Sequence, residues 1–207
     1  MDLQKTLHEI FLSSPPNRFD AFIDMCQKWY ARPAHNLAEL KSRDNKKIKG
    51  DIFENFSVLY LQSKGYEAWR LEDVPEPLLT QLALKRRDMG IDIVCVKDGL
   101  YSSVQCKYIA PKDKKVGLSW RTLSTFYALC ARSGPWDKNI VMTNCNYVRR
   151  VGKKSEKDVS IVLNSFQNMT NEEWLQMCGT IEVTQFSNVL SLEELREARL
   201  KRLEKLV

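Results

Sequence analysis

The sequence predicts an α/β fold in which a mixed β-sheet has helices on both of its faces. Two β-branched stretches, 91–96 and 101–108, are joined by a tight turn at 97–99, which is typical of a hairpin. Amphipathic segments of helical period, such as 51–64 and 119–132, flank these stretches. Because a hairpin and helical crossovers occur together, the sheet is expected to combine antiparallel and parallel strands.

The remaining elements follow from periodicity, turn residues and helix caps. Gly65 ends the helix over 51–64, and the pairs Thr170/Glu173 and Ser191/Glu194 have the spacing of capping boxes. Helices are expected over 1–40, 51–64, 119–132, 155–168, from 170 to near 179 and from 191 onward, and strands over 66–71, 91–96, 101–108, 138–143 and 180–186.

Composition narrows the class of protein. The chain has 207 residues, 43% of them hydrophobic and 28% charged, as in a soluble globular protein. It contains no apolar run long enough for a membrane helix and no secretory signal at its start. Its six cysteines form no C-x-x-C pair, and two histidines complete no zinc site. An intracellular protein with reduced thiols, in the cytoplasm or the nucleus, is therefore expected.

The net charge of +6 favours binding to a polyanion. The basic residues gather in three runs, over 41–49, 107–121 and 149–157. Any single run is compatible with an ordinary solvated face, but two of the three adjoin the segments that carry the polar residues described next.

One face of the predicted hairpin carries an unusual set of polar groups. Alternation along 102–108 puts Gln105 and Lys107 on the same face, opposite Val104 and Cys106. Asp92 interrupts the apolar run of the partner strand, where an unpaired carboxylate is costly to bury. A strand-edge aspartate facing water is the simpler interpretation of Asp92 taken alone.

Glu54 is the second acid that stands out, because it shares a mostly apolar helix face with Val58 and Leu61. It is also compatible with an acid favoured by the helix dipole. Together, Glu54, Asp92, Gln105 and Lys107 supply two carboxylates, an amide oxygen and an ammonium. Oxygen ligands suit Mg²⁺, and a metal with a nearby cation suits phosphodiester hydrolysis.

Four short motifs occur in order along the chain: Gly50-Asp51-Ile52-Phe53-Glu54, Gly65-Tyr66, Met89-Gly90-Ile91-Asp92-Ile93-Val94 and Val104-Gln105-Cys106-Lys107. Together they resemble the Mrr-type branch of the PD-(D/E)XK, or restriction-endonuclease-like, nuclease superfamily. A later segment, Ile140-Val141-Met142-Thr143-Asn144, is similar to another element of that branch. The resemblance covers roughly residues 49–150 and implies a restriction-endonuclease-like α/β fold and Mg²⁺-dependent DNA cleavage, with Mn²⁺ able to substitute.

The resemblance also implies a role for each site residue. Asp92 and Glu54 correspond to metal-binding carboxylates, Lys107 is the motif lysine, and the backbone carbonyl of Cys106 is a further metal ligand. Gln105 stands where most of the superfamily has Asp or Glu, so it offers an oxygen without a charge. The same substitution is a pattern of the Mrr-type branch.

Basic residues beside the motifs are candidates for contacts with DNA phosphates. They are Lys49, Arg87, Lys112, Lys114, Lys115 and Arg121. Trp120 and Tyr108 are candidates for stacking on bases, although the helical spacing of Trp120 with Leu123 and Tyr127 favours a core position for the tryptophan.

Domain organisation and partners are expected as follows. Residues 1–48 form an N-terminal helical extension, 49–187 the nuclease core and 188–207 a charged C-terminal helix. The segment 87–108, followed by Leu118-Ser119-Trp120-Arg121, Phe126 and Thr143-Asn144, also resembles nuclease domains that precede superfamily 2 helicases in some viral and bacterial proteins. A fused or associated helicase is therefore one expected partner besides DNA. Double-strand cutting with one site per chain usually calls for a homodimer.

Two other functions are compatible with the sequence. The first is a DNA-binding module on the same fold that lacks catalysis because Gln105 has no charge. The second is a protein-interaction or assembly domain whose basic runs contact acidic partners.

Overall fold

The computed structural model describes residues 2–34, 36–37, 45–109, 117–149 and 155–179. Its elements begin with α1 (Leu3–Ser13), α2 (Arg18–Ala31), α4 (Asn45–Ser63), β1 (Glu67–Arg70), η1 (Leu71–Asp73) and α5 (Glu76–Gln81). They continue with β2 (Ile93–Lys97), β3 (Leu100–Lys107), η3 (Trp120–Leu123), α6 (Ser124–Arg132), β4 (Lys138–Thr143), β5 (Asp158–Ile161), α7 (Leu163–Gln167) and α8 (Asn171–Cys178).

The five described strands form one mixed sheet in the order β1-β2-β3-β4-β5. Strand β2 pairs antiparallel with both β1 and β3, whereas β3–β4 and β4–β5 are parallel. The hairpin register places Ile93 opposite Val104. The predicted α/β class and the mixed sheet are confirmed.

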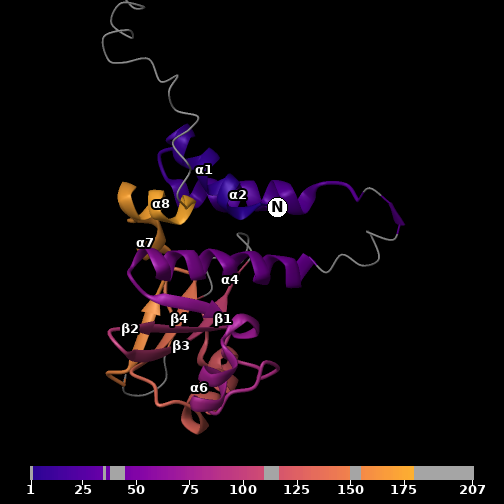
Figure 1. Cartoon of the computed structure of the whole chain (residues 1–207). Coiled ribbons are helices and arrows are strands. Elements are labelled where there is room, and N and C mark those ends of the chain that lie inside the picture. Colours follow the sequence, from indigo (N-terminus) through magenta and orange to yellow (C-terminus); the bar gives the residue numbers. More distant parts are fainter. Residues whose placement is uncertain (1, 35, 38–44, 110–116, 150–154, 180–207) are drawn as a thin grey trace, which may run out of the picture.

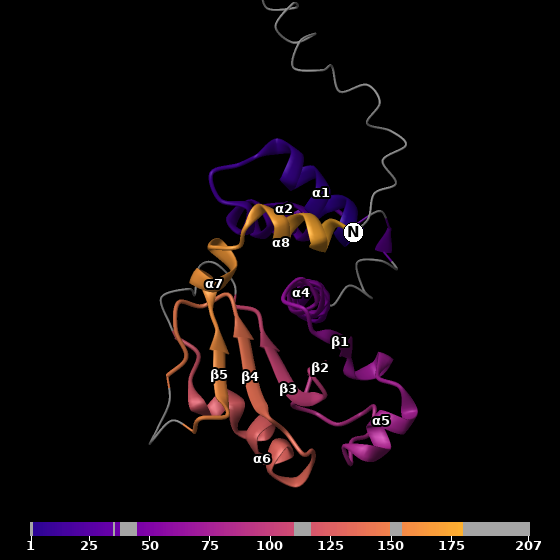
Figure 2. The same ribbon diagram turned by 60° about the vertical axis from the view of Figure 1, so that its left-hand side comes forward.

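Helices cover both faces of the sheet (Figures 1 and 2). One face packs against α4, and α1, α2 and α8 lie beyond that helix. The opposite face packs against α6 and the segment around α5. Strands are therefore buried on both sides, which explains why 93–96 has a continuous apolar run rather than an alternating one.

Aromatic rings dominate the core on the α4 side. Phe22 stacks on Phe56 of α4 with 4.7 Å between ring centroids, and Phe19 stacks on Phe166 at 4.8 Å. These four rings are almost fully buried, and each such side chain contributes about 2–3 kcal/mol by burial. The packing joins α2 to α4 and to α7.

Two local predictions were wrong. Residues 155–168 do not form one helix: Asp158–Ile161 is strand β5, and α7 follows it. Residues 119–132 begin with the 3₁₀ turn η3 before α6. The connection over 72–89 contains the short helix α5, in which a proline occupies the first turn, where its missing N–H has no cost.

The capping box at Thr170 and Glu173 is present and opens α8, as the sequence predicts. The predicted strand over 180–186 and the charged helix over 188–207 lie outside the described residues. Within the described ranges, the helices are too short or too polar to cross a membrane.

Candidate active site

Asp92 lies immediately before β2 and is held by its own backbone. Its N–H donates to the carbonyl of Val104 over 2.9 Å, and its carbonyl accepts from the N–H of Leu71 over 2.8 Å. Its side-chain Oδ2 accepts from the backbone N–H of Cys106 over 2.7 Å. The carboxylate is therefore fixed against β3, the strand that carries Gln105 and Lys107.

Burial raises the pKa of Asp92 above its ordinary value. The Cys106 N–H, the ammonium of Lys107 and the amide of Gln105 act in the opposite direction, because each favours the charged carboxylate. Gln105, Cys106 and Lys107 therefore interact with Asp92 directly.

Gln105 is only 4% exposed, and its Oε1 has no hydrogen-bond partner within the described residues. Its neighbours Val104 and Cys106 belong to the core on the α4 side. A buried amide oxygen without a partner carries a desolvation penalty of about 1–3 kcal/mol. Such an oxygen is available to a cation or a donor from outside the chain.

Glu54 reaches the same site from α4. Burial raises its pKa to about 7, and the negative charge of Asp92 adds to the rise. The guanidinium of Arg70 lowers it, with 3.9 Å between Arg70 Nε and Glu54 Oε2. A buried carboxylate whose pKa is raised further by a second carboxylate is typical of a site prepared for an external cation.

The end of β3 is fastened to β4 by two polar side chains. Thr143 lies opposite Lys107 in the parallel pair and donates its hydroxyl to the Lys107 carbonyl over 2.8 Å. The Asn144 amide is fully buried and pairs with both the N–H and the carbonyl of Ile109, at 2.8 and 2.7 Å. These contacts fix the backbone on both sides of Lys107, whose side chain stays partly exposed.

Gly90 places the strand of Asp92 against α6. Its φ is +120°, and a Cβ at this position would lie 3.0 Å from the backbone nitrogen of Phe126. Glycine is thus required twice, for the backbone conformation and for the close approach of the helix. This is a structural reason for the glycine of the Gly90-Ile91-Asp92 motif.

A family model described as a restriction endonuclease of the Mrr type matches residues 60–177, more than half of the chain. This chain belongs to the Mrr-type restriction endonuclease family. Membership indicates nuclease activity, with DNA as the substrate. The match includes Asp92, Gln105 and Lys107, whereas Glu54 precedes it, so the assignment of Glu54 depends on its position in the structure.

Other comparisons add little to the Mrr-type assignment. No curated protein matches the chain. Among solved structures, the crystal structure of protein of unknown function AF1548 is similar, with a TM-score of 0.38 and 18% identity over 70% of this chain and 76% of that chain.

The donor set of this Mrr-type domain fits a hard divalent cation. Among the described residues, no group of three or more His, Cys, Asp or Glu side chains is placed to hold a metal. The two carboxylates of Glu54 and Asp92 would need a neutral oxygen, and the partnerless Oε1 of Gln105 supplies one. Two charged and one or more neutral oxygens, with waters completing the shell, suit Mg²⁺ better than Zn²⁺.

The predicted DNA contacts lie in different environments. Arg87 and Arg121 are exposed, on the segment before Gly90 and on η3. Lys49 is partly buried, with its Nζ 4.9 Å from the ring centre of Tyr30. Lys112, Lys114 and Lys115 lie outside the described residues.

The two aromatic candidates for base stacking differ in exposure from what the sequence predicts. Trp120, expected in the core, is 40% exposed. Tyr108 is half-buried and hydrogen-bonded to Gln27 of α2, so it packs under α2.

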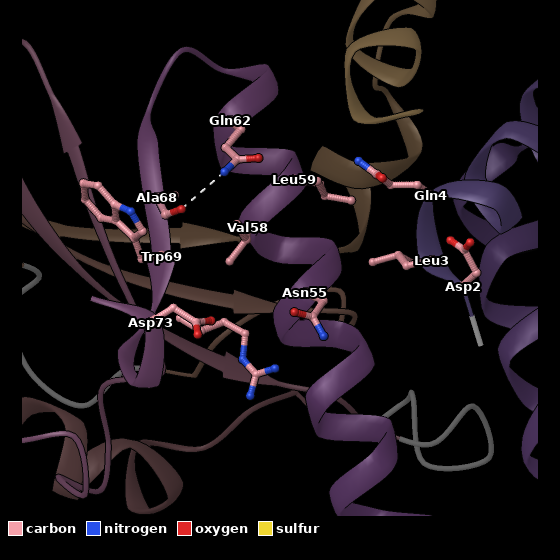
Figure 3. A pocket seen from close by; sticks show the side chains of 11 residues that line it. Asp2, Leu3, Gln4, Asn55, Val58, Leu59, Gln62, Ala68, Trp69 and Asp73 are labelled. Carbon is pink, nitrogen blue, oxygen red and sulfur yellow. Dashed lines mark hydrogen bonds between the residues drawn. The ribbon is translucent and has the colours of Figure 1, made fainter. Parts of the chain in front are cut away.

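Arg70 is the residue at the site that the sequence did not indicate. It ends β1, lies beside Glu54 and forms an ion pair with Glu72. It also lines a cavity of about 410 Å³ between α4, β1 and the start of α1, with Asn55, Val58 and Trp69 (Figure 3). The lining of this cavity includes neither Glu54 nor Asp92. An arginine at a strand end has no local signature, because its contact with Glu54 depends on how α4 packs.

Proposed function

We propose that this domain is an Mg²⁺-dependent DNA endonuclease whose site consists of Glu54, Asp92, Gln105 and Lys107. One observation carries the proposal. The amide with the buried, partnerless oxygen interacts with the Asp92 carboxylate, and Asp92 in turn interacts with the motif lysine and raises the pKa of Glu54. This is an unfavourable arrangement for an apoprotein and a favourable one for binding a cation.

Each side chain has a distinct part in the proposed reaction. Asp92, Glu54, the Gln105 oxygen and the Cys106 carbonyl would hold the metal, with Mn²⁺ able to replace Mg²⁺. When bound, the ion polarises a phosphoryl oxygen and lowers the pKa of a water molecule. Lys107 orients the attacking water or stabilises negative charge that develops on the phosphate.

The raised pKa of Glu54 has a consequence for this scheme. Near pH 7 the side chain is divided between its protonated and ionised forms. It can serve as a ligand only after losing its proton, so cation binding and proton release are coupled.

The test compares the wild-type protein with Asp92→Ala and Lys107→Ala on labelled duplex DNA with Mg²⁺. Each variant should lose cleavage by at least about a hundredfold while its circular dichroism spectrum stays unchanged. The matched controls are Asp24→Ala and Lys85→Ala, which remove exposed groups of the same charge and should cleave normally. Cleavage that survives Asp92→Ala would overturn the proposal.

A DNA-binding module without catalysis is the second candidate, favoured by the missing charge at Gln105. Calorimetry with Mn²⁺ distinguishes the two. A nuclease should bind Mn²⁺ and lose that binding in Asp92→Ala, whereas a module without catalysis should show no Mn²⁺ binding that depends on Asp92. A protein-interaction domain would show no DNA affinity. Dimerisation for double-strand cutting and association with a helicase remain further proposals, to be tested by the oligomeric state on DNA and by co-purification.

A further inference from the structure

Two large aromatic side chains are exposed close to the candidate active site. Trp120 is 40% exposed and Tyr147 is 42% exposed. The Trp120 ring stacks on Tyr127, with 4.8 Å between centroids and 21° between planes. Burying such rings is worth about 2–3 kcal/mol each, so their exposure beside a functional site has a cost that binding a ligand would recover.

Backbone pairing brings the two aromatics into one surface. Leu118 forms a parallel bridge with Val148, and the N–H of Arg149 donates to the Leu118 carbonyl over 2.7 Å. Trp120 follows Leu118 by two residues, and Tyr147 directly precedes Val148. The ring of Tyr147 also covers Gly117 so closely that any Cβ there would overlap it. The pairing therefore holds the 117–121 and 147–149 segments side by side.

This surface adjoins the motif residues through two connections. Tyr147 comes four residues after Thr143, which lies opposite Lys107 in the sheet. Trp120 precedes α6, and the start of α6 packs on Gly90, two residues before Asp92. A ligand seated on the aromatics would consequently extend toward the carboxylates.

Positive charge surrounds the aromatic rings. Arg149 lies 5.7 Å from the ring centre of Tyr147 and donates to its hydroxyl over 3.1 Å. Arg121 is exposed beside Trp120, and no ion pair within the described part of the chain engages either arginine. Exposed rings among cations match the requirements of single-stranded nucleic acid, whose bases stack on the rings while its phosphates meet the cations.

We propose that Trp120, Tyr147, Arg121 and Arg149 form a base-stacking surface that binds an unpaired stretch of DNA next to the active site. Bases in an intact duplex stack on one another and expose only their edges, so stacking on Trp120 selects unpaired DNA. The inference rests on the proposed function and narrows its substrate to DNA with single-stranded or frayed segments.

The experiment measures binding in EDTA, where cleavage plays no part. Fluorescence anisotropy follows a labelled 20-nucleotide single strand and the duplex of the same sequence. The variants are Trp120→Ala and Trp120→Phe, and the control is Leu175→Ala, which removes a large exposed apolar side chain from α8. Trp120→Ala should weaken single-strand binding about tenfold, with Trp120→Phe restoring most of it and Leu175→Ala changing nothing. Duplex binding should change less than twofold.

Three results would contradict the proposal of a base-stacking surface. They are unchanged single-strand affinity in Trp120→Ala, an equal loss for single strand and duplex, or no single-strand binding by the wild type. None of these depends on cleavage. Duplex cleavage with Mg²⁺ that is lost in Asp92→Ala would still support the proposed function, so the two proposals fail separately.

Discussion

The Asp92 carboxylate accepts a hydrogen bond from the backbone N–H of Cys106, with 2.7 Å between Oδ2 and N. This bond connects the Gly-Ile-Asp segment with the Gln-x-Lys strand through a side chain rather than through the ladder alone. Asp92 therefore has a structural role that can be separated from its proposed part in catalysis.

Replacement of Asp92 should separate these roles. Asp92→Asn keeps an oxygen for the Cys106 N–H, whereas Asp92→Ala leaves that group unpaired. Asp92→Ala should be less stable than Asp92→Asn by about 1–3 kcal/mol in urea denaturation at pH 7. Both should lose cleavage, since neither supplies a carboxylate. Equal stability of the two variants would show that the hydrogen bond contributes nothing.

Glu54→Gln should change how stability depends on pH. The native pKa of Glu54 is about 7, against an ordinary value of 4.5, so the folded protein binds this proton more tightly than the unfolded chain. The resulting stabilisation is complete below the unfolded value and is lost as pH rises through 7. Glu54→Gln imitates the protonated form at every pH.

In EDTA, the stability advantage of Glu54→Gln over wild type should therefore grow from about 1 kcal/mol at pH 5 to about 3 kcal/mol at pH 8. Urea denaturation at the two pH values measures this difference. Glu67→Gln, an exposed glutamate on β1, is the matched control and should show no such trend. An advantage for Glu54→Gln that stays constant with pH would contradict the raised pKa.

Gln105→Glu should strengthen cation binding and lower the stability of the metal-free protein. The new carboxylate would lie beside Asp92, where Gln105 now leaves a partnerless oxygen. The Mg²⁺ concentration at half-saturation, measured by calorimetry, should fall about tenfold because the ligand set gains a negative charge. Without metal, repulsion should lower stability by about 1–3 kcal/mol.

The control for this change is Gln81→Glu, an exposed glutamine at the end of α5, which should leave both quantities unaltered. If Gln105→Glu destabilises the protein and added Mg²⁺ does not restore its stability, Gln105 does not face a cation site.

Local patterns were sufficient for the hairpin and its polar face. The β-branched run before Lys97 and the alternation through Gln105 and Lys107 depend only on neighbours in the chain. Strand β5 could not be predicted in this way, since its four residues are half-buried and acquire their partners only from the parallel edge of β4. Likewise, the contact of Arg70 with Glu54 depends on the packing of α4 and leaves no trace in local sequence.

The position of Trp120 shows how a periodicity can mislead. Its spacing with Leu123 and Tyr127 predicts a buried helical stripe. The segment from Trp120 to Leu123 is a 3₁₀ turn, so the angle between successive side chains differs from that of the α-helix that follows. Leu123 stays buried while Trp120 is displaced to the surface.

Gly90 and Gly99 provide a matched pair for testing the contact between the Asp92 segment and α6. Both have a positive φ, +120° and +76°, so alanine is strained at either position. At Gly99 a Cβ would meet no atom within 4 Å, whereas at Gly90 it would lie 3.0 Å from the backbone nitrogen of Phe126. The Phe126 nitrogen belongs to the backbone of α6, which cannot rotate away from the added Cβ as a side chain can.

Gly99→Ala should therefore cost about 1 kcal/mol, the strain of the backbone alone. Gly90→Ala should cost about 2 kcal/mol more, because α6 must move. It should also reduce cleavage at saturating Mg²⁺, since Asp92 is two residues away and follows any displacement of Gly90. Urea denaturation and cleavage of duplex DNA measure the two effects. Equal costs at the two glycines would mean that α6 accommodates the extra carbon, and Asp92 would then be positioned by its hydrogen bonds to β3 and Leu71.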